Sequence, residues 1–203
     1  MGIDDIAEGD PLKAGVCEAV WAGLRREVVA GRRAVAAIGV GAMVVCLALA
    51  AVARVYLPFT PVPITLQTFF VLVAGAALGR RLGTVALSSY LLLGVVGFPL
   101  FTGAWLGPTT GYLVGFVGAG WLIATVVRRV ERPSTARLAA AMLAGTALIY
   151  ACAVAHLTLF LRIGFSQAVA IGVAPFLIGD ALKLAAAVAV CRATRDRLRV
   201  LFP

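Results

Sequence analysis

One acid and one base lie close together in an apolar stretch near the end of the chain, at residues 175–183. Asp180 and Lys183 are three residues apart, so on a helix they share a face. Ionisable side chains in a hydrophobic span are costly and commonly functional, whereas an ion pair that only fixes helix packing is the competing interpretation. We therefore interpret Asp180 and Lys183 as candidate ligand-binding groups.

Two further polar motifs, at 61–68 and 107–112, each combine prolines with hydrogen-bonding side chains where a helix is expected to begin. Their candidate binding residues are Thr65, Gln67, Thr109, Thr110 and Tyr112. Trp105 precedes the second motif and is expected to form part of a lid. An apolar pocket with a few convergent polar groups suits a small molecule. Taken singly, each residue has an alternative role as a helix cap or a bridge between helices.

Several classes of chemistry lack support in this sequence. Neither lysine belongs to a phosphate-binding G-x-x-x-x-G-K-[ST] loop, and no nucleophile elbow or H-E-x-x-H motif occurs in the spans. The four cysteines are scattered, which favours neither a metal site nor a disulfide framework. His156 has no second imidazole or nearby acid in sequence, which favours packing over a proton relay. We expect a protein without metal or cofactor that is not an enzyme.

The composition indicates what positions these residues. Apolar residues make up 62% and charged residues 13% of the chain, whereas soluble domains carry about 25% charged residues. Apolar runs of about 20 residues predict an all-α polytopic membrane protein with six transmembrane helices. The predicted parts are a cytoplasmic N-terminal segment at 1–33, a membrane domain at 34–192 and a basic cytoplasmic tail at 193–203. The first span is expected at about 34–57, after a short separate helix at about 16–29.

Basic residues give this topology a direction. Nearly all lysines and arginines fall on one side of the six spans, the exceptions being Arg54, Arg162 and Lys183. By the positive-inside rule both termini are cytoplasmic and the protein lies in the cell membrane. The net charge of +9 then faces membrane lipid and does not indicate nucleic-acid binding.

Three motifs, at 61–69, 107–116 and 175–183, occur in order and at compatible spacing. Together they strongly resemble the substrate-binding S component of energy-coupling-factor (ECF) biotin transporters, the BioY family. The resemblance implies a six-helix subunit that binds biotin at its outer side. It also implies inward delivery when the subunit docks on a transmembrane coupling protein with two ATPase subunits. Two departures stand out: Thr110 replaces the first of two family glycines, and the connection from Phe101 to Gly107 is short and poor in glycine.

The resemblance also implies roles for individual residues. Asp180 is expected to accept the ureido N–H groups of biotin, and Lys183 to donate to an oxygen of the ligand. The valerate carboxylate must then reach the loops, where the candidates are Thr109, Thr110, Tyr112 and Arg54.

Partner docking is expected on the first span, where the small residues Ala37 and Gly41 would let another helix approach closely, although packing inside the bundle explains them equally well.

Two other functions remain open from the sequence. Altered loop residues would suit an S component for another small vitamin. A proton-coupled carrier would use Asp180, Lys183 and His156.

Overall fold

The computed structural model describes residues 11–97, 107–128 and 133–201, with side chains described between residues 31 and 194 of these ranges. By its internal contacts the chain divides into Met1–Ile38 and Gly39–Pro203. The first unit contains the N-terminal part of helix α1. The second contains the helical bundle and the cavity described below.

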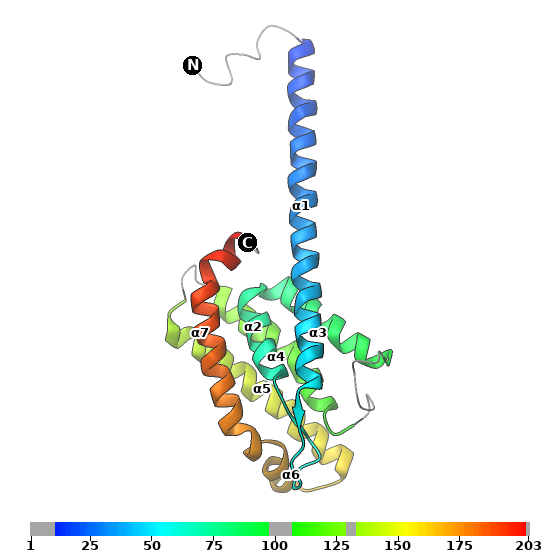
Figure 1. Ribbon diagram of the computed structural model, residues 1–203, viewed down its shortest axis with the longest axis vertical. Helices are drawn as coiled ribbons and strands as arrows, with labels where there is room; N and C mark the ends of the chain where they lie inside the picture. Colours follow the sequence, from blue (N-terminus) through cyan, green and yellow to red (C-terminus); the bar gives the residue numbers. More distant parts are fainter. Residues whose placement is uncertain (1–10, 98–106, 129–132, 202–203) are drawn as a thin grey trace. The chain divides into compact units, whose positions relative to one another are not determined.

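Helices account for nearly all of the described chain (Figure 1). Six α-helices longer than ten residues occur in it: α1 (Pro11–Val52), α2 (Gln67–Ala77), α3 (Gly79–Val95), α4 (Thr110–Arg128), α5 (Thr135–Leu161) and α7 (Leu177–Leu201). A short helix, α6 (Phe165–Gly172), and a 3-10 turn, η2 (Ala174–Phe176), lead into α7. The expected all-α class is thus confirmed, apart from one small ribbon of two strands.

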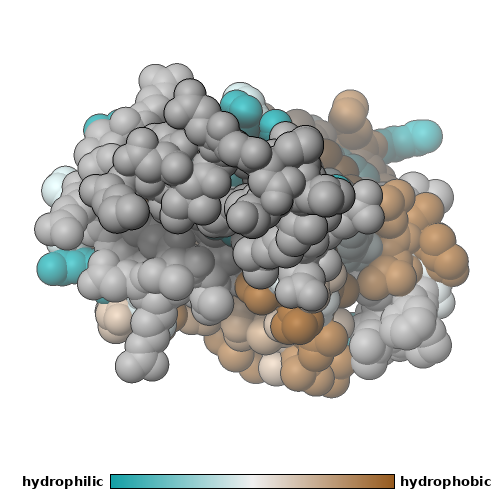
Figure 2. All heavy atoms as spheres, turned by 90° about the horizontal axis from the view of Figure 1, so that it is seen from above, coloured by the Kyte–Doolittle hydropathy of each residue, from teal (hydrophilic) through white to brown (hydrophobic). Residues whose placement is uncertain are grey.

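Four segments of the described chain are long and apolar enough to cross a membrane: Gly31–Val52, Thr110–Arg128, Thr135–Leu161 and Phe165–Thr194. Their outward side chains are apolar, as a lipid environment requires. On α7, Ile178 is 80% and Leu182 is 68% exposed, whereas Asp180 is only 6% exposed. Brown, hydrophobic side chains likewise cover much of the described surface in Figure 2. The protein is a multi-pass membrane protein.

The first apolar run ends differently from the sequence expectation. Helix α1 stops at Val52 instead of continuing to about residue 57, because β1 (Arg54–Val55) leaves the helix to pair with β2 (Ile64–Thr65). The two strands are antiparallel, with Arg54 opposite Thr65 and Val55 opposite Ile64. At its other end α1 begins at Pro11, so the separate helix expected at 16–29 is part of α1.

Glycines allow the helices of the bundle to approach one another closely. A Cβ on Gly111 would lie 2.5 Å from His156 Cβ, and a Cβ on Gly115 would lie 2.9 Å from Ile149 Cα. These glycines are four residues apart on α4, so both face α5 and bring the two backbones together. The contact fixes the start of α4, which carries part of the site.

The two ends of the bundle differ in charge. The ribbon β1–β2 and α6 lie at one end, and α7 runs from there to the other (Figure 1). Basic side chains gather at that other end, where Arg128 lies against Gly79 and Arg137 Nε donates to the Val126 carbonyl over 3.2 Å. Asp180, in the first turn of α7, therefore belongs to the ribbon end.

Candidate functional site

A cavity of about 410 Å³ lies within the unit Gly39–Pro203, between the ribbon, the first turns of α2 and α4, and the first turns of α7. This size is in the range of about 300–1,000 Å³ usual for small-molecule sites. Its polar wall is formed by Arg54, Thr65, Gln67, Thr68, Thr109, Asp180 and Lys183. Aromatic rings form much of the remainder, from Tyr56, Tyr90, Tyr112, Phe116, Phe160 and Phe176.

Asp180 is the centre of the most extensive hydrogen-bond network in the described cavity. Its Oδ1 accepts from Lys183 Nζ at 2.7 Å and from Thr68 Oγ1 at 3.0 Å. Its Oδ2 accepts from the Tyr150 hydroxyl at 2.7 Å. Lys183 is 12% exposed and Asp180 6%, so the ion pair is largely withdrawn from water. Three helices, α2, α5 and α7, thereby hold one carboxylate in a fixed position.

The start of α2 contributes a second polar cluster. Thr65 Oγ1 donates to Gln67 Oε1 at 3.1 Å, and Gln67 Nε2 donates to the Tyr90 hydroxyl of α3. Gln67 and Tyr90 are both buried, so their polar atoms need such partners. The amide is thus oriented before any ligand arrives.

The start of α4 separates the two threonines of its motif. Thr109 lines the cavity, whereas the buried Thr110 accepts from the Gly107 N–H at 3.1 Å through its side-chain oxygen. Thr110 is not among the residues that line the cavity, and its hydrogen bond closes the turn that begins α4. The predicted role of Thr110 as a binding residue therefore stays a prediction, and its placement in the turn does not add to it.

Tyr112 and His156 form hydrogen bonds to backbone carbonyls of segments next to the cavity. The Tyr112 hydroxyl donates to the Gly172 carbonyl at the end of α6, and the ring lines the cavity. His156 Nε2 lies 3.0 Å from the Gly107 carbonyl oxygen, and its ring stacks on Phe160 at 5.4 Å. Both His156 partners are untitratable, which supports the packing interpretation of this histidine.

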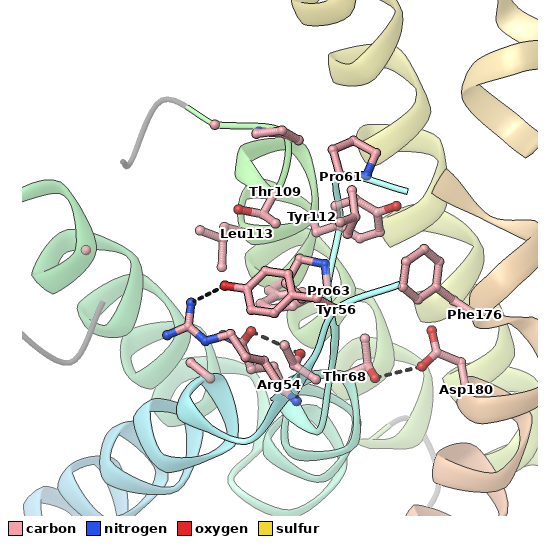
Figure 3. A pocket seen from close by; sticks show the side chains of 18 of the residues that line it. Arg54, Tyr56, Pro61, Pro63, Thr68, Thr109, Tyr112, Leu113, Phe176 and Asp180 are labelled. Carbon is pink, nitrogen blue, oxygen red and sulfur yellow. Dashed lines mark hydrogen bonds between the residues drawn. The ribbon is translucent and has the colours of Figure 1, made fainter. Parts of the chain in front are cut away.

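The side of the cavity away from Asp180 carries Arg54. Figure 3 shows Arg54 beside Tyr56 on one side and Asp180 on the other, with Thr68 between them. Arg54 Nη1 donates to the Tyr56 hydroxyl at 3.1 Å, and its guanidinium carbon lies 6.0 Å from the centre of that ring. Arg54 belongs to β1 and Tyr56 directly follows that strand, and both side chains line the cavity.

The structure thus brings together seven residues that the sequence identified: Arg54, Thr65, Gln67, Thr109, Tyr112, Asp180 and Lys183. Trp105 lies outside the described residues. Ala37 and Gly41 are both exposed on α1, and neither is among the residues that line the cavity.

Three residues with evident roles at the site were missed. Thr68 and Tyr150 bond the Asp180 carboxylate, and Tyr56 bonds Arg54. Thr68 was detectable, since it follows Gln67 in the same motif; Tyr150 lies mid-way along α5 with no local signal. Among the described residues, no group of three or more His, Cys, Asp or Glu side chains is placed to hold a metal ion.

The fold and the cavity together define a multi-pass membrane protein with a binding site for a small, partly polar molecule. Comparison with known proteins gives the family. The sequence matches the BioY family over residues 24–200. The chain belongs to the BioY family.

Individual relatives also belong to this family, and a solved structure has a similar fold. The biotin transporter BioY of Thermotoga maritima is 36% identical over 141 residues, which cover 66% of this chain and 82% of that protein. The biotin transporter BioY of Rhizobium etli is 31% identical over 162 residues, covering 73% of this chain and 86% of that one. A crystal structure of the S component for biotin from an ECF-type ABC transporter is 21% identical and has the same fold. Its TM-score is 0.78, with 85% of this chain and 98% of that chain covered.

Proposed function

We propose that this protein is the biotin-binding S component of an ECF-type vitamin transporter. One observation carries the proposal: a buried carboxylate, Asp180, paired with Lys183 and further bonded by Thr68 and Tyr150, faces an aromatic cavity. Biotin's ureido ring offers two N–H donors and one carbonyl acceptor, and its bicyclic body is apolar. The cavity offers the complementary groups at one side and apolar walls around them.

The hydrogen bonds already present refine how the ureido group would bind. An ionised carboxylate has about four acceptor positions, and Asp180 uses two on Oδ1 and one on Oδ2. One ureido N–H then goes to Asp180 Oδ2. The other goes to Thr68 Oγ1, which donates a hydrogen bond to Asp180 and still has lone pairs with which to accept one. Lys183 has two further N–H donors for the ureido oxygen.

The proposed topology has six crossings with both termini in the cytoplasm. Four of the crossings are the four long apolar segments. The other two are α2 and α3, which have 11 and 17 residues and lie between the first and second of these segments in the chain. Basic residues at the end opposite the ribbon, among them Arg128 and Arg137, support a cytoplasmic position for that end. The site then opens to the outside. Within this topology we keep 1–33 as a cytoplasmic segment, 34–192 as the membrane domain and 193–203 as a cytoplasmic tail.

Transport requires partners, which we take to be a transmembrane coupling protein and two ATPase subunits. The exposure of Ala37 and Gly41 on α1 supports this face as the dock, since small residues let a partner helix approach closely. Substituting either residue with leucine should weaken co-purification with the coupling protein and leave biotin affinity nearly unchanged. An equal loss of both would mean that these residues serve the bundle itself.

Calorimetry on the detergent-purified protein tests the proposed ligand. Biotin should bind tightly and raise the melting temperature, because a ligand that binds only the folded state stabilises it by mass action. The purified chain should hydrolyse no ATP. Riboflavin and thiamine serve as controls: tight binding of either, without binding of biotin, would overturn the proposal in favour of another vitamin.

The presence of Thr110 in place of a family glycine gives little support to a ligand other than biotin. The side chain of Thr110 closes the turn at Gly107 and does not line the cavity, so this residue should not alter the shape of the cavity wall. Replacing Thr110 with glycine, as in the family, should therefore leave ligand choice and affinity within about twofold, corresponding to less than about 0.5 kcal/mol.

A further inference from the structure

His156 contacts the cavity wall without being part of it. It is not among the residues that line the cavity, yet its side chain contacts two that are, Gly107 and Phe160. Its Nε2 lies 3.0 Å from the Gly107 carbonyl oxygen, and its ring stacks on Phe160 with the ring centres 5.4 Å apart. Because a carbonyl oxygen only accepts hydrogen bonds, Nε2 carries a proton and is the donor.

Gly107 has no side chain to fix its position, so its backbone contacts decide where it lies. Its N–H donates to Thr110 Oγ1 and its carbonyl accepts from the Thr110 N–H, each at 3.1 Å. Both of these bonds lie within one turn, so they give the turn its shape without attaching it to another helix. The bond from His156 attaches the turn to α5, 49 residues away in the chain.

Close packing between α4 and α5 brings the imidazole within reach of this turn. A Cβ on Gly111 would lie 2.5 Å from His156 Cβ and 2.7 Å from the Cys152 carbonyl oxygen, so a larger residue would separate the two helices here. Gly107 precedes Gly111 by four residues, which is about one helical turn. The ring of His156 therefore extends from Gly111 back to the Gly107 carbonyl.

We propose that His156 is a positioning residue for the ligand, because it holds the segment 107–109 in place. Gly107, Pro108 and Thr109 all line the cavity, and the proline ring restricts the backbone between the other two. Displacement of Gly107 would thus be passed on to Thr109, and the ligand would lose contacts with this wall and dissociate faster. The inference rests on the proposed function. It also goes beyond packing, since it requires the N–H donor of His156 and not only the ring.

Three substitutions of His156 separate the donor from the ring. His156→Phe keeps an aromatic ring against Phe160 and removes the donor. His156→Gln removes the ring and keeps an amide N–H that is as many bonds from Cα as Nε2 is. His156→Asn keeps the same amide one bond closer to the backbone, so that it falls short of the Gly107 carbonyl.

The measurement is the rate at which bound biotin dissociates from the detergent-purified protein when excess competing biotin is added. His156→Phe and His156→Asn should raise this rate by about two- to tenfold, as expected for loss of one hydrogen bond that acts mainly on dissociation. His156→Gln should stay within about twofold of the parent. Packing alone predicts a different order, because the ring would then matter: His156→Phe would resemble the parent, and both amides would release biotin faster.

Thr158→Val is the matched control. Thr158 lies on the same helix and donates to the Ala155 carbonyl at 2.8 Å, but neither residue lines the cavity, so this variant should release biotin at the parent rate. A His156→Gln variant that releases biotin as fast as His156→Asn would overturn the positioning role and leave the proposed function intact. This comparison of two amides decides the matter even where His156→Phe does not fold. A parent that binds no biotin would instead overturn the proposed function, and with it the role that rests on it.

Discussion

The Asp180 side and the Arg54 side of the cavity are built from different kinds of structure. Asp180 is 6% exposed, and groups from α2, α5 and α7 all bond its carboxylate. Arg54 is partly exposed on a two-residue strand and bonds Tyr56, which is 66% exposed. Buried, fully bonded networks are costly to disturb, whereas partly exposed charges are screened by water.

Because of this difference, substitutions on the two sides of the cavity should have different effects on folding and on ligand binding. Substitutions on the Asp180 side should affect folding and binding together, since the same hydrogen bonds serve both. Substitutions of Arg54 and Tyr56 should affect binding alone, because Arg54 is partly exposed and Tyr56 is 66% exposed. The predictions below test this division, beginning with the largest effect.

Lys183→Met should cause the greatest loss of stability. It leaves Asp180 buried without its cation, which costs about 3–5 kcal/mol in protein interiors. Thermal unfolding of the detergent-solubilised protein measures the effect. The double variant Asp180→Leu/Lys183→Met is its control: it should regain only part of the stability, because the hydroxyls of Thr68 and Tyr150 lose their acceptor, and it should still bind no biotin. A single variant as stable as the parent would show that the pair is not energetically coupled.

Asp180→Asn should separate binding from folding more cleanly. The amide keeps the shape and one acceptor oxygen but loses the charge, so charge-assisted hydrogen bonds worth roughly 1.5–3 kcal/mol each are lost. Biotin affinity should fall at least about tenfold. The loss should be much smaller for an analogue whose ureido nitrogens are blocked. Unchanged biotin binding by the folded variant would reduce the Asp180–Lys183 pair to a structural bridge.

Tyr150→Phe and Thr68→Val form a matched pair on the same carboxylate. Each removes one donor to Asp180, so each should lower stability by about 1.5–3 kcal/mol, the range for hydrogen bonds to charged groups. Thr68 lines the cavity and Tyr150 does not, so Thr68→Val should also weaken biotin binding directly, by more than Tyr150→Phe does. Equal effects on affinity would argue against Thr68 as a ligand group.

Tyr56→Phe should have the smallest effect, confined to binding. It removes one neutral hydrogen-bonding group near Arg54, worth about 0.5–1.5 kcal/mol, so biotin affinity should fall by roughly two- to tenfold. The melting temperature without ligand should not change. A lowered melting temperature would mean that the Arg54 side also stabilises the fold. The Asp180 side and the Arg54 side would then not differ in this respect.

Local sequence determined the class of the protein and much of the site. Apolar runs predict membrane helices because a bilayer accepts few unpaired backbone or charged groups, and the α5 and α7 spans agree with those runs. Asp180 and Lys183 were found because their three-residue spacing on a helix dictates their contact. Gln67 and Thr109 were found because helix starts concentrate polar groups.

Tertiary structure alone decided which side chains lie at the cavity. Tyr150 bonds Asp180 from a helix 30 residues earlier in the chain, and no local pattern predicts such a contact. Thr109 and Thr110 are adjacent and chemically identical, yet only Thr109 lines the cavity, because the turn at Gly107 uses the other hydroxyl. Arg54 faces the site because β1 pairs with β2, which required α1 to end five residues before its apolar run does. Helix periodicity is a property of neighbours in sequence, whereas these placements depend on packing between segments far apart in it.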